Sequence, residues 1–192
     1  MGDEHEITIL DVKRSEVLAR LRKLKARHIG SHKFRRVEFL VKGNVGGGHS
    51  WGRVRTNGKE TTITLKETQG KGGFTSMKEY EVKADNFEEA ARIMTRLVGS
   101  RIVVYFENER DAYRLGDAQV TIDKWPEIPA YVEIEAPSMA AVKKAYKRLN
   151  ITGKFVGNIS IHKIYGHYGL SFEKVMAKNR PKLNRLLGRT NK

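Results

Sequence analysis

Short stretches in which apolar and polar residues alternate recur along the chain. The clearest are residues 4–10, 78–84 and 131–137, and each carries two glutamates two positions apart. Because strand side chains alternate between faces, the glutamates of a stretch share one side and its apolar residues share the other. Each stretch precedes a segment with apolar residues at helical spacing, within residues 11–26, 85–99 and 138–150. We therefore expect three units of a strand followed by a helix.

The ends of two of these helices have recognisable residues. Asp85 and Glu88 stand at the spacing of a capping box, and Gly99 is a plausible stop for the same helix. Ser138 is the expected N-cap of the third helix.

Further strands are expected between these units. They are predicted within residues 32–41, 51–56, 61–67, 101–115 and 118–123, while residues 154–169 are less regular. Asn57-Gly58 and Gly116-Asp117 separate pairs of these strands and indicate hairpins. The pattern predicts about eight mainly antiparallel strands, with three helices at most before the C-terminal stretch, which is an α+β protein.

The polar sides of these strands are unusually rich in charge. They hold glutamate pairs on three strands and arginine or lysine on three others. An antiparallel sheet that turns its polar side to water would explain alternation alone. Two carboxylates about 7 Å apart, however, repel by roughly 2 kcal/mol at an effective dielectric of 20. A bound divalent cation would offset that repulsion. We therefore expect a sheet that closes with its ionic faces inward, its apolar exterior covered by the three helices.

Composition sets the class of partner. The 192 residues include 37 Lys plus Arg against 22 Asp plus Glu, a formal net charge of +15, so the partner is expected to be an anion, either nucleic acid or a small polyphosphate. No cysteine is present, which excludes disulfides and thiolate zinc sites. The sequence has neither a long apolar run nor a signal-like start, so we expect a cytoplasmic protein with no membrane segment. Residues 173–192 are expected to form a basic helix or a solvated tail.

The order of charged motifs resembles the CYTH domain, the family of class IV adenylate cyclases and thiamine triphosphatases that is also called triphosphate tunnel enzymes. The near-N-terminal E-x-E-x-K of that family is matched by Glu4-x-Glu6-x-Thr8. The similarity spans roughly residues 4–170. Its other matching residues, in chain order, are Arg53, Arg55, Lys66, Glu79, Glu81, Arg110, Tyr113, Asp123, Glu133 and Glu135.

The resemblance implies a fold and a site. The fold would be an eight-stranded antiparallel closed β-barrel over residues 1–172, a tunnel that binds a triphosphate with Mg²⁺ or Mn²⁺. The implied metal ligands are Glu4, Glu6, Glu133 and Glu135. The implied phosphate-binding residues are Arg53, Arg55, Lys66 and Arg110. Catalysis would rest on Glu4, Glu6, Lys66 and Arg110, with Glu79, Glu81 and Asp123 as further ligands or partners of the arginines.

Two positions depart from the family pattern. Thr8 and Asn108 stand where the family has lysine. Hydrogen bonds to charged groups are each worth about 1.5–3 kcal/mol, so two losses would weaken phosphate binding unless other cations replace them. The candidates for replacement are Arg114, Lys124 and Lys163. Binding with reduced catalysis is one expected outcome.

Three functions follow from this pattern. The leading hypothesis is metal-dependent hydrolysis of an inorganic, nucleoside or organic triphosphate, by a monomer or a homodimer. The alternative chemistry is a class IV adenylate cyclase reaction that converts ATP to cyclic AMP. The alternative from another class is a non-catalytic binder of polyphosphate or RNA, suggested by the net charge of +15.

Overall fold

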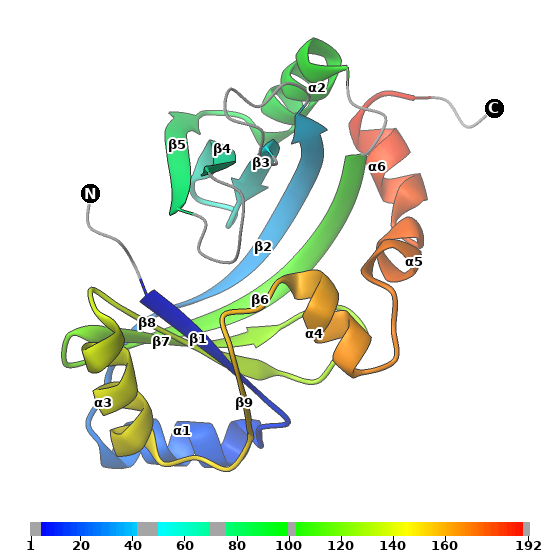
Figure 1. Ribbon diagram of the computed structural model, residues 1–192. Coiled ribbons are helices and arrows are strands. Elements are labelled where there is room, and N and C mark those ends of the chain that lie inside the picture. Colours follow the sequence, from blue (N-terminus) through cyan, green and yellow to red (C-terminus); the bar gives the residue numbers. More distant parts are fainter. Residues whose placement is uncertain (1–4, 42–49, 70–75, 100–102, 190–192) are drawn as a thin grey trace. The chain divides into compact units, whose positions relative to one another are not determined.

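The computed structural model of the chain describes residues 5–41, 50–69, 76–99 and 103–189, which form nine strands and six helices (Figure 1). The strands are β1 (His5–Leu10), β2 (Arg27–Val41), β3 (Ser50–Thr56), β4 (Thr61–Gln69), β5 (Ser76–Ala84), β6 (Val103–Leu115), β7 (Ala118–Lys124), β8 (Tyr131–Ala136) and β9 (Lys154–Gly157). The helices are α1 (Arg14–Lys23), α2 (Phe87–Val98), α3 (Met139–Leu149), α4 (Ile161–His167), α5 (Phe172–Ala177) and α6 (Arg180–Leu186). The three predicted strand-helix units are β1–α1, β5–α2 and β8–α3, and the α+β class is confirmed.

The strands form one sheet in the order β5-β4-β3-β2-β6-β7-β8-β1-β9. The prediction of a closed eight-stranded barrel is wrong in two respects. The sheet has nine strands, and its order over the described residues is open, with β5 and β9 at the ends. The short strand β9 explains the difference, because it pairs with the edge of β1 that β8 leaves, so β1 has no edge available for closure.

The chain separates into two compact units. Unit 1 comprises the described residues up to Lys33 and Asn108–Phe172, and unit 2 comprises the described residues of Phe34–Glu107 and of Glu173–Lys192. The long strands β2 and β6 each contribute residues to both units.

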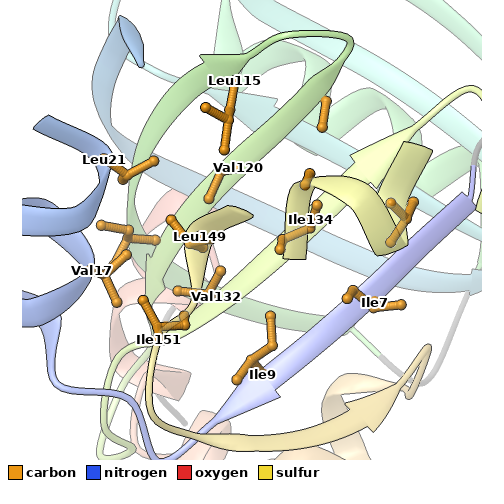
Figure 2. Close-up of a cluster of buried hydrophobic side chains, with 14 of the residues drawn as sticks. Ile7, Ile9, Val17, Leu21, Leu115, Val120, Val132, Ile134, Leu149 and Ile151 are labelled. Atoms are coloured by element: carbon orange, nitrogen blue, oxygen red, sulfur yellow. The ribbon is translucent and has the colours of Figure 1, made fainter. Parts of the chain in front are cut away.

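The core of unit 1 lies between its strands and the helices α1 and α3. Figure 2 shows Ile9 of β1 and Val132 of β8 close to Val17 of α1 and Leu149 of α3. All four side chains are fully buried. Burying an aliphatic side chain of this size contributes about 1.5–3 kcal/mol, so this layer fixes the apolar side of β1 and β8 inward and leaves their glutamates on the other side.

The core of unit 2 lies between β2, β3 and the helices α2 and α6. Val37 and Val54 pack with Phe87 of α2 and with Leu183 and Leu186 of α6. The basic C-terminal stretch therefore folds into helices over its described residues and buries apolar side chains. The predicted boundary between a tunnel domain of residues 1–172 and a tail of residues 173–192 stays a prediction.

Two sequence expectations about helices need correction. The side chain of Asn86, not Asp85, accepts the hydrogen bond that caps α2, from the backbone N–H of Glu89 at 3.0 Å. The less regular segment 154–169 forms β9 and α4, so the described residues contain four helices that end before residue 172, instead of three at most. The expected cap at Ser138 is present, and Gly99 ends α2 with φ 58°. None of the described helices combines the length and apolar character needed to cross a bilayer.

Both predicted hairpins are confirmed. Gly58 has φ 87° between β3 and β4, and Gly116 has φ 64° between β6 and β7. Glycine adopts such positive φ values without steric strain. The expectation that helices cover the whole apolar side fails at β5, where Tyr80 is 54% and Val82 is 62% exposed. The main contacts of α2 with the described strands are with β3 and β4, and these two side chains on the apolar side of the edge strand β5 stay exposed.

Candidate functional site

The polar sides of β6, β7, β8 and β1 form rows across unit 1. In these rows each residue lies directly opposite its neighbour on the next strand, from β7 to β8 to β1. The rows are Gln119, Glu135 and Glu6, then Thr121, Glu133 and Thr8. Strand register thus brings together three of the four proposed metal ligands, Glu6, Glu133 and Glu135. Glu4 lies outside the described residues.

Arg110 of β6 is tied to two of these carboxylates. Its Nε donates to Oδ1 of Asp123 at 2.8 Å, and its Nη2 donates to Oε2 of Glu133 at 2.6 Å. Thr121 Oγ1 donates to the other oxygen of Asp123 at 2.8 Å. Burial opposes the charged guanidinium, but the two carboxylates outweigh it and raise the pKa of Arg110. Two of the donor groups expected to bind phosphate are therefore engaged by unit 1's own carboxylates.

Glu6 and Glu135 are the best-placed candidates for holding a cation. They lie directly opposite each other on β1 and β8, a position at which Cβ atoms are about 4.5–5.5 Å apart and like charges are destabilising. Among the described residues, no three His, Asp or Glu side chains are grouped so that they could hold a metal ion. The pair fits Mg²⁺ or Mn²⁺ in a site that takes its other ligands from water and substrate oxygens, as Mg²⁺ commonly does.

Two uncharged polar residues of the same face are buried. Thr8 is 0% and Asn108 is 3% exposed. The Thr8 hydroxyl and both polar atoms of the Asn108 side chain have no hydrogen-bond partner in the described part of the chain. Thr8 lies opposite Glu133, and Asn108 is two residues before Arg110 on β6. The two residues that depart from the family pattern therefore both adjoin the group of Arg110, Asp123, Glu133 and Thr121, called here the Arg110 cluster.

Unit 2 carries a second charged face, on β2 to β5. Register places the charged residues of four strands in three adjacent rows. The rows, from β2 to β5, are Glu38, Arg53, Thr64 and Glu81; Arg36, Arg55, Thr62 and Lys83; and Leu40, Trp51, Lys66 and Glu79. Arg53, Arg55 and Lys66 therefore share one face, whereas Arg110, the fourth residue expected to bind phosphate, belongs to unit 1.

Arg53 and Arg55 lie farther from the glutamates of β5 than Arg110 lies from its two carboxylates. Arg53 lies 3.8 Å from Glu79 and 3.9 Å from Glu81, and Arg55 lies 3.9 Å from Glu81. These distances exceed those of charge-assisted hydrogen bonds, which are about 2.7–2.9 Å. Two lysines of the same face form closer pairs, because Lys66 Nζ lies 2.7 Å from Glu79 and Lys83 Nζ lies 2.8 Å from Glu60. The glutamates of β5 therefore act as partners of the basic residues in this structure, one of the two roles expected for them.

Sequence reasoning missed several contributors to this face. Arg36 is 6% exposed and lies opposite Arg55, and its guanidinium is 5.1 Å from the Phe34 ring centroid. Arg55 lies 4.9 Å from the same ring. Thr64 donates to Glu81 at 2.8 Å. Residues two positions apart share one face of a strand, so the alternation that runs from Phe34 through Arg36 predicts the position of Arg36 on this face.

The cations suggested as substitutes for the two absent lysines have different surroundings. Arg114 is exposed at the end of β6, in register with Gln119, and its Nη1 donates to Asp117 O at 3.4 Å. Lys124 has the opposite parity to Asp123 on β7 and donates to the backbone carbonyl of Ile128. Lys163 is exposed on α4. Their substitution for lysine stays a prediction, as does a channel in which acidic and basic faces meet.

Comparison with known proteins identifies the family of this chain. The model of the CYTH domain matches residues 47–158, more than half of the chain. This protein belongs to the CYTH family. No curated protein matches the chain.

Solved structures support the CYTH fold. The PH1012 protein of Pyrococcus horikoshii OT3 matches with a TM-score of 0.63 and 20% identity, over 78% of this chain and 92% of that one. HpAC1 from Hippeastrum, an adenylyl cyclase candidate described as having a dominant triphosphatase activity, matches with a TM-score of 0.58 and 15% identity, over 88% and 97%. A conserved hypothetical protein from Pyrococcus furiosus matches with a TM-score of 0.58 and 20% identity, over 90% and 94%. At sequence identities of 15–20%, these similarities show a shared fold alone.

Proposed function

We propose that this CYTH protein is a metal-dependent enzyme that binds and hydrolyses a triphosphate. The observation that carries the proposal is the face of unit 2, where Arg53, Arg55 and Lys66 share one side of adjacent strands. Arginine offers a planar fork that matches phosphate oxygens, and lysine adds a compact point charge. Arg53 lies 3.8 Å from Glu79 and 3.9 Å from Glu81, beyond the length of a charge-assisted hydrogen bond, so a phosphate oxygen could approach it more closely than these carboxylates do.

The acidic face of unit 1 would supply the metal. Glu6 and Glu135 would hold Mg²⁺ or Mn²⁺, with Glu133 and Glu4 as further proposed ligands. When bound, the cation supplies charge neutralisation at the phosphates and lowers the pKa of an attacking water. Lys66 and Arg53 would then orient and stabilise the charged phosphoryl oxygens, which is the main protein contribution in phosphoryl transfer.

Cyclisation of ATP is the second candidate chemistry. It would use the same phosphate and metal residues, with the 3′-oxygen of the substrate attacking the α-phosphorus. HpAC1, with its adenylyl cyclase name and its dominant triphosphatase activity, favours hydrolysis over cyclisation for a protein of this fold. The products separate the two reactions, because a cyclase releases cyclic AMP and pyrophosphate.

The test is a substrate panel. Inorganic triphosphate, ATP, GTP and thiamine triphosphate are incubated with the full chain, with and without Mg²⁺ and Mn²⁺, and products are separated by ion-exchange chromatography. We expect phosphate release that requires the added cation. Turnover indistinguishable from buffer with every triphosphate would contradict an enzyme and leave the non-catalytic binder.

The metal assignment is tested by Glu135→Gln. Glutamine is neutral, so the substitution removes one negative charge from the Glu6–Glu135 pair that is proposed to hold the cation. We therefore expect kcat to fall at least about 100-fold and the Mg²⁺ concentration for half-maximal rate to rise. Glu89→Gln, an equivalent change at an exposed position of α2, is the matched control and should leave both values unchanged. Unaltered turnover in Glu135→Gln would refute the assignment.

A further inference from the structure

Helices α1 and α3 of unit 1 carry an excess of positive charge. Both cover the apolar side of the strands, and they lie next to each other, because Arg20 Nε of α1 donates to Leu149 O of α3 at 2.8 Å (Figure 1). Their only carboxylate is that of Glu16, which accepts hydrogen bonds from Thr152. Exposed cations of the two helices that form no ion pair with a carboxylate in the described part of the chain are called here the basic helical face; they are Arg22, Lys23, Lys143, Lys144, Lys147 and Arg148.

The α3 cations of this face point away from the core of unit 1. Val142, Ala145 and Leu149 are buried on the side of α3 that faces the strands. At about 3.6 residues per turn, positions 143, 144, 147 and 148 fall on the opposite side of the helix. Like charges four residues apart destabilise a helix, and two such pairs occur here, 143 with 147 and 144 with 148. A bound polyanion would offset this repulsion.

A hollow lies between α3 and the turn that joins β6 to β7. It has a volume of about 50 Å³, and its lining includes Lys144 and Arg148. Asp117 also lines it, so the two cations leave the hollow with a net positive charge. Arg148 Nη1 would lie 3.5 Å from a β-carbon added at Gly116, which places the guanidinium beside the turn. A single water needs about 10–15 Å³ of such space, so the hollow can admit a phosphate group.

The surroundings of the basic helical face favour a nucleic-acid duplex over a membrane or a single strand. Helices that bind bilayers insert an apolar face, but the apolar faces of α1 and α3 are buried at Val17, Leu21 and Leu149. Proteins that bind single strands add aromatic side chains on which bases stack. The one aromatic residue of these two helices, Tyr146, is partly buried and packs against Phe155. What remains on the face is charge, which suits a phosphate backbone.

We propose that the basic helical face binds the phosphodiester backbone of double-stranded nucleic acid, independently of sequence, with one backbone phosphate in the hollow. This inference goes beyond the proposed function and does not depend on it. The two helices pack on the apolar side of the strands of unit 1, whereas Glu6 and Glu135 lie on the other side. Neither the proposed metal ligands nor the phosphate-binding residues of unit 2 take part.

The experiment measures binding of the full chain to fluorescein-labelled DNA and RNA duplexes of one sequence, about 20 base pairs long, by fluorescence anisotropy. Salt is varied between about 50 and 200 mM, and no triphosphate is present. We expect a Kd of about 1–100 μM at physiological salt, the range of sequence-independent binding, with an affinity that falls steeply as salt rises. The two duplexes should bind within about tenfold of each other, because backbone contacts carry no sequence information.

The deciding variant combines Lys143→Gln, Lys144→Gln and Arg148→Gln. Each phosphate contact contributes about 0.9 to the slope of log Kd against log salt on duplex DNA, so we expect the slope to fall by about 2–3 and the affinity to fall at least about tenfold. Lys143→Arg with Lys144→Arg keeps the charge and should bind like the unaltered protein. If the triple variant does not fold, Arg148→Gln alone should lower the slope by about 1.

The matched control combines Arg180→Gln, Arg185→Gln and Arg189→Gln. It removes the same charge from exposed positions in and directly after α6, none of which forms an ion pair in the described residues. The control should change the slope by less than about 1. Equal losses in the two triple variants would overturn the proposal, because net charge alone would then explain binding.

Further outcomes also decide the matter. Failure of the unaltered protein to bind either duplex overturns the proposal, and so does binding to phosphatidylserine vesicles without binding to a duplex. A preference above about tenfold for one duplex contradicts a contact confined to the backbone. The rise in Tm caused by inorganic triphosphate reports on the proposed function and should be the same in the α3 triple variant. Its loss there would mean one shared anion site and would overturn a separate face.

Discussion

Single side chains decide how the charge of unit 1 is tolerated. Asp123 is 0% exposed in its side chain and receives hydrogen bonds from Arg110 and Thr121. A buried charge without a partner is strongly unfavourable, whereas a buried charge with satisfied oxygens is tolerated. The Arg110 cluster is therefore a structural element of unit 1, whatever else it binds.

Removing the arginine tests this role. In Arg110→Met, Asp123 and Glu133 lose their common cation, and we expect a loss of about 3 kcal/mol in the free energy of unfolding. Urea denaturation at pH 7 measures it. The same substitution in an Asp123→Asn background should be less damaging, because the buried charge is already gone. A loss below about 1 kcal/mol, equal in both backgrounds, would contradict the cluster.

Helix caps and hairpin turns define the ends of the elements in this fold. For α2, the sequence does not decide which of two neighbouring residues is the N-cap. Residues 85 and 86 are both good cap residues, and the capping-box spacing favours Asp85. The chain instead enters α2 so that Asn86 has extended backbone angles and its side chain reaches Glu89 N–H. The entry angle is set by Phe87, which is buried against the core of unit 2.

The position of the cap gives a matched pair of variants. Asn86→Ala removes the capping acceptor, and we expect it to lower the free energy of unfolding by about 1 kcal/mol. Asp85→Ala removes a neighbouring polar side chain and should change stability by less than half as much. Chemical denaturation of both proteins checks the prediction. A larger effect at Asp85 would restore the capping box as the start of α2.

The whole molecule carries a formal charge of +15, but its basic residues do not act alike. The charged face of unit 1 is mainly acidic, with one arginine already paired, while that of unit 2 holds the basic rows. If net charge alone attracted polyanions, any two basic residues would contribute equally. If placement matters, those of the unit 2 face should dominate.

Pairs of charge-matched substitutions distinguish these cases. We expect inorganic triphosphate to raise the Tm of the protein, and Arg53→Met with Lys66→Met to remove most of that rise. Lys59→Met with Lys147→Met removes the same charge from two exposed positions and should preserve it. The rise is measured by differential scanning fluorimetry at physiological salt. Equal losses in both double variants would indicate non-specific attraction, as expected of a polyanion binder.

Much of this arrangement could be read from local pattern. Alternation placed Arg53 with Arg55 and Glu133 with Glu135 on shared faces, because strand side chains alternate whatever the strand's neighbours are. Glycine at Gly58 and Gly116 located both hairpins for the same local reason. The same alternation places Arg36 on the charged face of unit 2. The adjacent Arg35 obscures this, because two consecutive arginines interrupt the alternation of apolar and polar residues.

The sequence by itself determined eight of the nine described strands, the two-faced character of each, and the identity of the charged residues, since these depend on interactions within a few positions. Tertiary structure decided which residues lie opposite one another: Glu6 opposite Glu135, and Arg110 within reach of Glu133. It also decided that β9 takes the edge of β1 and leaves the order of strands open. Pairing between distant strands depends on register and on competition for edges, which no local pattern encodes.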